Sequence, residues 1–110
     1  MPAPRYVPRN YASRDAAVFG KQEKLRWRPI DELTDQELDE LRASQMQHAL
    51  ALRINEQILY RFQSLVDYTD FASIKPATLG RMLRGETVMR LEDIARAERL
   101  LGVPSGLSER

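Results

Sequence analysis

The sequence Lys75-Pro-Ala-Thr-Leu-Gly-Arg-Met-Leu-Arg-Gly-Glu86 predicts a short helix with a defined beginning and end. Proline fits the first turn of a helix, where it has no amide hydrogen to lose, so the helix should begin at Pro76. Gly85 should end it, because glycine adopts the left-handed conformation of a helix terminus without strain. Helical spacing then gives an inner face of Leu79, Met82 and Leu83 and an outer face of Lys75, Ala77, Thr78, Arg81 and Arg84.

Two more helices are expected on either side of this stretch. Ser64 and Asp67 have the spacing of a capping box, in which a hydroxyl and a carboxylate satisfy free amides at the start of a helix. That helix would begin at Leu65 and break near Ser73. Downstream, apolar residues recur at three- and four-residue spacing until Gly102 stops them: Leu91, Ile94, Ala95, Ala97, Leu100 and Leu101.

The region from Ser64 to Val103 resembles the Cro/C1-repressor type of helix-turn-helix, which occurs in phage repressors, bacterial regulators and many antitoxins. It covers about forty of the 110 residues. The residues that carry the resemblance are Ser64, Ile74 in the turn, Thr78-Leu79, the exit Arg84-Gly85-Glu86 and the closing helix Leu91-Glu-Asp-Ile-Ala-Arg-Ala-Glu-Arg-Leu-Leu-Gly-Val103. The resemblance implies a small all-α bundle that binds double-stranded DNA.

Four positions depart from the pattern of that family. It usually has glutamine where Leu65 stands, a small residue at Thr69, glycine at Ser73 and a hydroxyl residue at Gly80. The differences at Leu65 and Gly80 each remove a phosphate contact that the resemblance would imply. Glycine inside a helix costs about 1 kcal/mol relative to alanine. We therefore expect a close approach at Gly80, either to DNA backbone or to another helix.

The resemblance also implies which residues would contact DNA. Lys75 or Arg81 would donate to guanine O6 and N7, and Ala77 or the Thr78 methyl group would touch a thymine methyl group. Positive charge at Arg81, Arg84 and Arg90 would engage phosphates. The full set of expected contacts is Ser64, Lys75, Ala77, Thr78, Arg81, Arg84, Thr87 and Arg90. The alternative is an ordinary solvated helix face.

Residues 1–30 are expected to form a basic, partly extended N-terminal arm. Prolines at positions 2, 4 and 8 favour an extended chain. Such an arm can lie in a minor groove or along phosphates, or it can be an untethered terminus. Trp27 either packs on a partner or pins the arm to the bundle, and residues 12–25 can form a short helix. The possible arm contacts are Arg5, Arg9, Arg26 and Arg28.

The distribution of charge agrees with this arrangement better than the net charge of +1. Residues 1–30 carry seven basic and two acidic groups, a net charge of +5. Residues 31–74 carry three basic and nine acidic groups, a net charge of −6. Residues 75–110 carry seven basic and five acidic groups, a net charge of +2. Basic charge thus gathers on the arm and around the helix expected to read DNA.

A long helix is expected before the helix-turn-helix. Thr34 and Glu37 form a capping box, and Leu33 and Leu38 form the apolar pair that often flanks one. Ser64 is the first strong signal that ends the helix. Its apolar residues follow several lines around the axis, so it is either contacted on several sides or divided near Asn55. The apolar residues along it are Leu38, Leu41, Met46, Leu50, Leu52, Ile54, Ile58, Leu59 and Phe62.

The surplus apolar surface of this helix has two interpretations. A homodimer would suit a helix-turn-helix protein that reads two half-sites. The alternative function is a protein-interaction module, resembling antitoxins or host-takeover proteins, that binds a partner through residues 38–62. Retention on DNA that falls steeply with salt would favour DNA over that module. Binding to single strands or RNA would need exposed aromatic residues interleaved with the basic ones, and the sequence lacks this pattern.

Other function classes find little support in the sequence. Ser44 lies four residues before His48, the only histidine, but nothing indicates a third group to orient them, so we expect no enzyme. No motif indicates a metal, a cofactor or a small-molecule substrate. There are no cysteines, no apolar run of membrane-spanning length and no secretion signal. We expect a cytoplasmic protein of a bacterial cell or phage-infected host.

These predictions combine into one expected architecture. Residues 1–30 form the arm, residues 31–104 form an all-α DNA-binding domain with its helix-turn-helix at about 64–103, and residues 105–110 form a C-terminal tail. The expected function is sequence-specific regulation of transcription. It would be exerted by a repressor that occupies an operator through the helix starting near Pro76, as in small phage immunity repressors.

Overall fold

The structure is a computed structural model that describes residues 5–103, and its regular elements in this range are all helices. The expected all-α fold class is confirmed. Three short 3-10 helices precede four α-helices in the described chain. They are η1 (Pro8–Tyr11), η2 (Ser13–Val18), η3 (Ile30–Glu32), α1 (Asp35–Arg61), α2 (Leu65–Ala72), α3 (Pro76–Leu83) and α4 (Leu91–Leu101). Residues 1–4, with two of the arm's prolines, and the expected tail at 105–110 lie outside the described residues.

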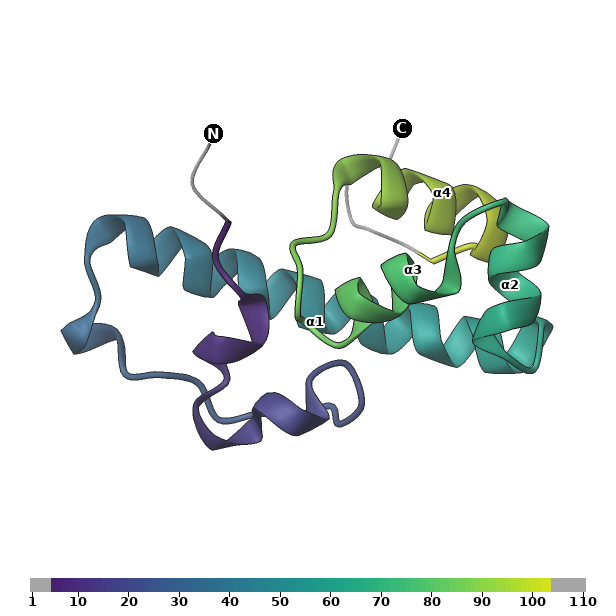
Figure 1. Ribbon diagram of the computed structural model, residues 1–110. Coiled ribbons are helices and arrows are strands. Elements are labelled where there is room, and N and C mark those ends of the chain that lie inside the picture. The colour runs from purple at the N-terminus through teal and green to yellow at the C-terminus, as the bar shows by residue number, and fades with distance from the viewer. Residues whose placement is uncertain (1–4, 104–110) are drawn as a thin grey trace.

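α1 is one continuous helix of 27 residues that runs the length of the molecule (Figure 1). The capping box is present, since Thr34 Oγ1 accepts from the Glu37 amide at 3.2 Å and Glu37 accepts from the Thr34 amide at 2.9 Å. Because α1 is continuous, it has no break near Asn55. Of the two arrangements predicted for it, the helix contacted on several sides is the one observed. In the described range, no helix combines the length and apolarity required to cross a membrane.

The main core lies between the C-terminal half of α1 and the three helices that follow it (Figure 1). Its buried residues are Ala51, Ile54, Ile58, Tyr68, Leu79, Met82, Leu83, Met89, Ala97, Leu101 and Val103. Gly102 ends α4 in the left-handed conformation (φ 70°), as expected. Leu91 and Ala95 belong to the apolar repeat predicted for this helix, but both are exposed. Leu91 is the first residue of α4 and is 73% exposed.

The buried stripe of α1 differs from the one its apolar residues predict. Met46 and Leu59 are 50% and 66% exposed, whereas Ser44, Gln47 and His48 are buried. The N-terminal segment supplies the backbone groups that bond to His48. Gln47 bonds to backbone groups at the end of α3 and in the loop after it, and Ser44 bonds to the Glu40 carbonyl of its own helix. Burial here follows the position around the helix, and hydrogen bonds satisfy the buried polar side chains.

The N-terminal segment is more compact than the expected arm. Pro8 begins η1 and is buried, and Tyr11 and Phe19 are 5% and 1% exposed. The Tyr11 hydroxyl donates to Glu40 of α1 at 2.7 Å. The extended chain predicted from the prolines at positions 2, 4 and 8 is thus wrong for Pro8 onward, because this stretch turns and buries side chains against α1. In Figure 1 the segment lies along the N-terminal half of α1.

Candidate nucleic-acid interface

α3 has the two faces that its spacing predicts. Leu79, Met82 and Leu83 are each only 4% exposed. Thr78 is half-buried, and the exposed residues on the outer side are Lys75, Ala77, Arg81 and Arg84. Because Ala77 is small and Thr78 is half-buried, these two side chains project little from the outer side of the helix between Lys75 and Arg81. Another surface can therefore approach the helix closely there.

A three-residue turn from Ser73 to Lys75 connects α2 to α3. Ser73 adopts the left-handed conformation (φ 59°), which glycine usually supplies at this position in the family that the sequence resembles. The Ile74 amide donates to the Thr69 carbonyl at 3.0 Å, and the Ile74 side chain packs against the core. The turn is therefore tied to α2, which fixes the direction in which α3 leaves it.

The start of α2 confirms half of its expected cap. Ser64 Oγ accepts from the Asp67 amide at 3.2 Å. The Asp67 carboxylate makes no return bond within residues 5–103, so the reciprocal part of the capping box was wrong. Ser64, an expected DNA contact, is half-buried and already serves as this cap.

Gly80 is buried, and its close neighbours belong to the protein. A Cβ atom at this position would lie 3.0 Å from a terminal nitrogen of Arg84 and 3.6 Å from Leu65 Cδ2 on α2. Of the two expected explanations for this glycine, approach to another helix matches these distances. A larger side chain would push against α2 and against the arginine at the end of α3.

The Gln47 side chain of α1 makes hydrogen bonds to backbone groups where the chain leaves α3. Its side-chain nitrogen donates to the Met82 carbonyl at 2.8 Å and to the Thr87 carbonyl at 2.9 Å. Its side-chain oxygen accepts from the Met89 amide at 2.9 Å. Thr87, an expected DNA contact, is exposed while its backbone is held in this way. This role of Gln47 could not be predicted from the sequence, because its partners lie 35 to 42 residues away.

Two expected phosphate contacts make ion pairs within the protein. Arg84 Nε donates to the Glu86 carboxylate at 2.7 Å, and Arg9 approaches the same carboxylate at 3.7 Å. Arg90 donates to the buried Asp93 carboxylate at 3.1 Å. The hydrogen bond from Arg84, with smaller contributions from the charges of Arg9 and Arg81, lowers the pKa of Glu86 below its usual value. Lys75 makes no ion pair within the described chain.

The four arginines predicted as possible arm contacts have different surroundings. Arg9 alone joins the ion pairs at the end of α3, and its amide donates to the Gly85 carbonyl at 2.9 Å. Arg26 pairs with Asp15 at 3.0 Å, and the Arg28 guanidinium lies 5.2 Å from the centre of the Tyr11 ring. Arg5 is exposed beside Tyr6. Arg26 and Arg28 thus help hold the segment together.

Trp27 packs within the protein, as one of its two interpretations predicted. Its ring lies edge-on to Phe19 and His48, with centroid distances of 6.4 and 5.8 Å. It is half-buried, and it pins the N-terminal segment to α1.

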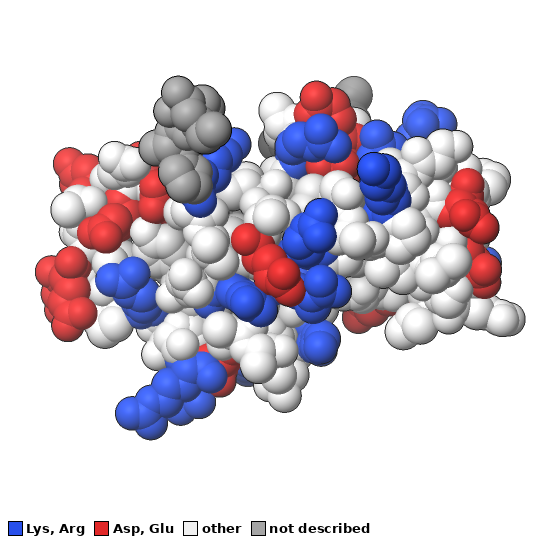
Figure 2. Space-filling view, viewed as in Figure 1, with Lys and Arg blue, Asp and Glu red and all other residues white. Residues whose placement is uncertain are grey.

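Figure 2 shows how charge is distributed on the face that includes the end of α3. Lys and Arg side chains lie in a band across the middle, and many of the Asp and Glu side chains lie toward the two ends of the molecule. Some acidic side chains lie inside the band. The surface therefore presents a positive stripe that its own carboxylates partly neutralise.

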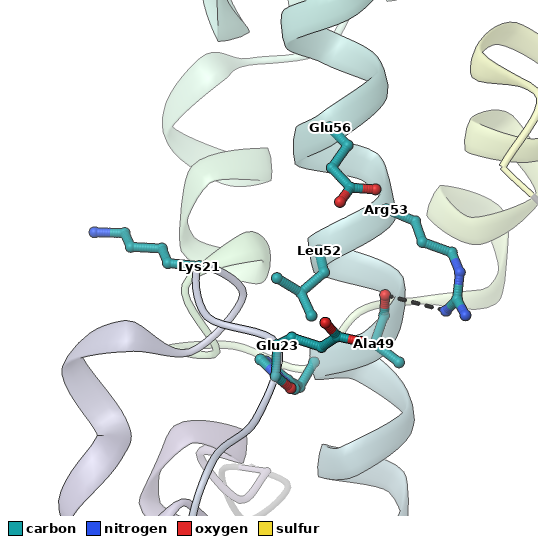
Figure 3. A pocket seen from close by; sticks show the side chains of 7 residues that line it. Lys21, Glu23, Ala49, Leu52, Arg53 and Glu56 are labelled. Carbon is teal, nitrogen blue, oxygen red and sulfur yellow. Dashed lines mark hydrogen bonds between the residues drawn. The ribbon is translucent and has the colours of Figure 1, made fainter.

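A hollow with about 450 Å³ of space lies along α1 (Figure 3). Lys21 and Arg53 extend from it in different directions. His48 is among the residues that line it, and His48 Nδ1 accepts from the Gly20 amide at 2.8 Å, while Nε2 lies 3.1 Å from the Glu23 carbonyl. Nε2 must then carry the proton, so the ring has no lone pair to accept one from a substrate.

The serine and histidine considered as a nucleophile and base make separate hydrogen bonds. Ser44 is buried and donates to the Glu40 carbonyl of its own helix at 2.7 Å. No group of three or more His, Cys, Asp or Glu side chains in the described chain could hold a metal ion.

Comparisons of the chain with protein-family models, curated proteins and solved structures find no match. The likeness to the Cro/C1 type therefore stays a resemblance carried by the residues quoted above.

Proposed function

We propose that this chain is a sequence-specific double-stranded DNA-binding regulator that inserts the outer face of α3 into the major groove. The observation that carries the proposal is the division of α3 into a fully buried apolar face and an exposed face with Lys75, Ala77 and Arg81. The major groove of B-DNA is wide enough to admit an α-helix, whose side chains can then reach the base edges. The exposed face of α3 supplies side chains of that kind.

The roles of individual residues follow from their places on α3. Lys75 and Arg81 carry the donors that guanine O6 and N7 accept, and Ala77 and the Thr78 methyl group suit a thymine methyl group. Arg84 and Arg90 lie at the end of α3 and before α4, where they can reach phosphates once their carboxylate partners release them. Occupation of a promoter by such a complex is enough to repress transcription.

Selection of bound sequences from a random duplex pool, followed by binding measurements across a salt series, tests this proposal. We expect enrichment of a short motif, with affinity that falls steeply as salt rises. Arg81→Ala should weaken binding to the selected duplex about tenfold or more and relax the preference at one base position. Arg42→Ala is the matched control, because Arg42 is an exposed arginine on α1 whose side chain, among the described residues, bonds only to Gln45.

The number of bound copies follows from the same selection. A palindrome would indicate a homodimer on two half-sites, whereas an asymmetric motif would indicate a monomer. Failure to enrich any motif, together with binding that is insensitive to salt and to Arg81→Ala, would contradict the proposal.

The second candidate function, a protein-interaction module, draws on exposed apolar side chains. Leu59 and Tyr60 at the end of α1 are 66% and 83% exposed, and Phe71 of α2 is 62% exposed. Tyr60→Ser should abolish binding of a protein partner and leave duplex binding unchanged, whereas Arg81→Ala should do the opposite.

A further inference from the structure

Glu86 lies between two arginines that come from distant parts of the chain. Its Oε2 atom is 2.7 Å from Arg84 Nε at the end of α3 and 3.7 Å from a terminal nitrogen of Arg9 in η1. Both arginine side chains are partly exposed, at 47% and 40%, and the Glu86 side chain is 29% exposed. The three side chains therefore form one accessible cluster beside the outer face of α3.

Backbone hydrogen bonds place the members of this cluster. The Glu86 amide donates to the Arg81 carbonyl at 2.9 Å, which fixes the carboxylate immediately after α3. The Arg9 amide donates to the Gly85 carbonyl at 2.9 Å, which brings η1 to the same point. Because the backbones are already fixed, forming the ion pairs orders only the side chains, and less conformational entropy opposes them than in a pair on free chains.

A carboxylate and a DNA phosphate compete for the same donors on a guanidinium. Both present charged oxygens that accept hydrogen bonds from arginine. The lowered pKa of Glu86 agrees with an ionised carboxylate stabilised by these arginines. In the free protein, the donors of Arg84 that face Glu86 are thus occupied by an internal anion.

We propose that Glu86 is an internal competitor for DNA phosphate, and that it reduces duplex affinity by holding Arg84 and Arg9. This inference rests on the proposed function. A phosphate carries no sequence information, so the competition weakens binding to every duplex by the same factor. Glu86 then sets the strength of binding and leaves the preference among sequences to α3.

The test compares five proteins on the selected duplex and on a scrambled duplex of equal length: wild type, Glu86→Gln, Glu56→Gln, the Arg9→Ala/Arg84→Ala double variant, and Glu86→Gln in that double-variant background. Glu56→Gln removes the same charge from an exposed position on α1 that makes no ion pair within the described residues. Fluorescence anisotropy at several salt concentrations gives affinity and salt slope. A thermal melt of each variant confirms that it is folded.

Glu86→Gln should bind both duplexes about fivefold more tightly than wild type at low salt, the strength of one well-formed exposed ion pair. The dependence of log affinity on log salt should steepen by about 1, because one more phosphate is neutralised. Glu56→Gln should stay within about twofold of wild type. In the background without both arginines, Glu86→Gln should gain less than about twofold over its own parent.

Each other outcome overturns the inference. An equal gain for Glu86→Gln and Glu56→Gln would mean that only net charge matters. A fivefold gain that persists without Arg9 and Arg84 would mean that Glu86 repels phosphate directly. Loss of affinity in a folded Glu86→Gln variant would mean that the carboxylate helps binding. If wild type binds neither duplex at low salt, the proposed function itself fails, and the inference fails with it.

Discussion

The N-terminal segment, residues 5–33, and the unit formed by α2, α3 and α4 are built in different ways. The three α-helices have local caps and share a continuous apolar core. The segment has only short 3-10 helices and is held by bonds to distant groups, such as the Gly20 amide to His48 and the Asn55 side chain to the Gly20 carbonyl. Local signals thus determine one region, and long-range contacts determine the other.

The two regions meet at the exit of α3. Phe19 lies against Gly85, and Gln47 bonds to backbone groups on both sides of that glycine. If the segment does not stabilise the helical unit, substitutions in the segment should leave the stability of α2 to α4 unchanged. If it stabilises the exit of α3, the same substitutions should destabilise both regions together.

The largest expected effect comes from Phe19. It is 1% exposed and lies edge-on to His48, so Phe19→Ala should lower the free energy of unfolding by about 3 kcal/mol. Urea denaturation followed by Trp27 fluorescence reports on the segment, and far-ultraviolet circular dichroism reports on the helices. Coincident transitions at a lower midpoint are expected. A shift in the fluorescence transition alone would show that the two regions unfold separately.

A double-mutant cycle with Gly85→Ala isolates the contact between the regions. An added Cβ atom would lie 2.7 Å from Phe19 Cδ1, and φ is 75° at this position. Gly85→Ala alone should cost the strain of that conformation, about 1 kcal/mol, and the clash with the ring. With Phe19→Ala only the backbone strain remains, so the double variant should be more stable than additivity predicts by about 1 kcal/mol. Strict additivity would contradict direct packing.

This contrast also explains which features could be predicted from the sequence. The starts and ends of α1 to α4 come from residues within a few positions, such as Thr34, Pro76 and Gly85, and so does the inner face of α3. The burial of Gln47 and His48 could not be predicted, because the backbone groups that satisfy them are 25 to 42 residues away. Nothing in the spacing of polar residues along a helix records such partners.

The candidate interface divides in the same way. The outer face of α3 was predictable because helical periodicity alone assigns it. The neutralisation of Arg84 by Glu86 depends on side-chain geometry at a helix exit, and the participation of Arg9 depends on the path of η1. An arginine that helical spacing places on an exposed face is therefore only weak evidence for a free positive charge, because an acidic side chain can pair with it in the fold.

The next largest effect is expected for Gln47. Gln47→Ala would leave the Thr87 carbonyl and the Met89 amide without their partner, while the Met82 carbonyl keeps the Gly85 amide at 3.2 Å. A buried unsatisfied polar group costs about 1 to 3 kcal/mol. We expect a loss of about 2 kcal/mol in the free energy of unfolding, and faster hydrogen exchange at the Met89 amide. Gln45→Ala on the same helix is the control, because the Gln45 side chain bonds only to exposed Arg42 within residues 5–103. Equal effects of the two substitutions would show that the bridge contributes nothing.

A smaller effect of opposite sign is expected within the helical unit. Ser73 holds a left-handed conformation, which costs a residue with a side chain about 1 kcal/mol. Ser73→Gly removes that cost but gives the unfolded chain more freedom, so we expect a net gain of about 0.5 kcal/mol. Ala49→Gly in the middle of α1 should instead lose about 1 kcal/mol. Thermal melts of both variants test the signs, and destabilisation by Ser73→Gly would contradict a strained turn.

The smallest effect belongs to the segment and depends on pH. Hydrogen bonds from the Arg26 side chain and amide lower the pKa of Asp15, so the folded state favours the ionised carboxylate. The resulting stabilisation is complete above the pKa of an unfolded aspartate, about 3.9, and is lost as the pH falls through the lower folded pKa. Asp15→Asn should therefore lower Tm at pH 7, and its Tm should converge with that of wild type toward pH 2.

Asp31→Asn provides the matched control for that measurement, since Asp31 is exposed and makes no ion pair within the described chain. It changes net charge equally but should show little of the convergence. Because Asp15 and Arg26 both belong to the segment, Trp27 fluorescence and circular dichroism should shift together only if the segment braces the helical unit. A pH-dependent transition seen by fluorescence alone would mean that the segment can detach while α2 to α4 stay folded, and Arg9 would then be free of Glu86 as well.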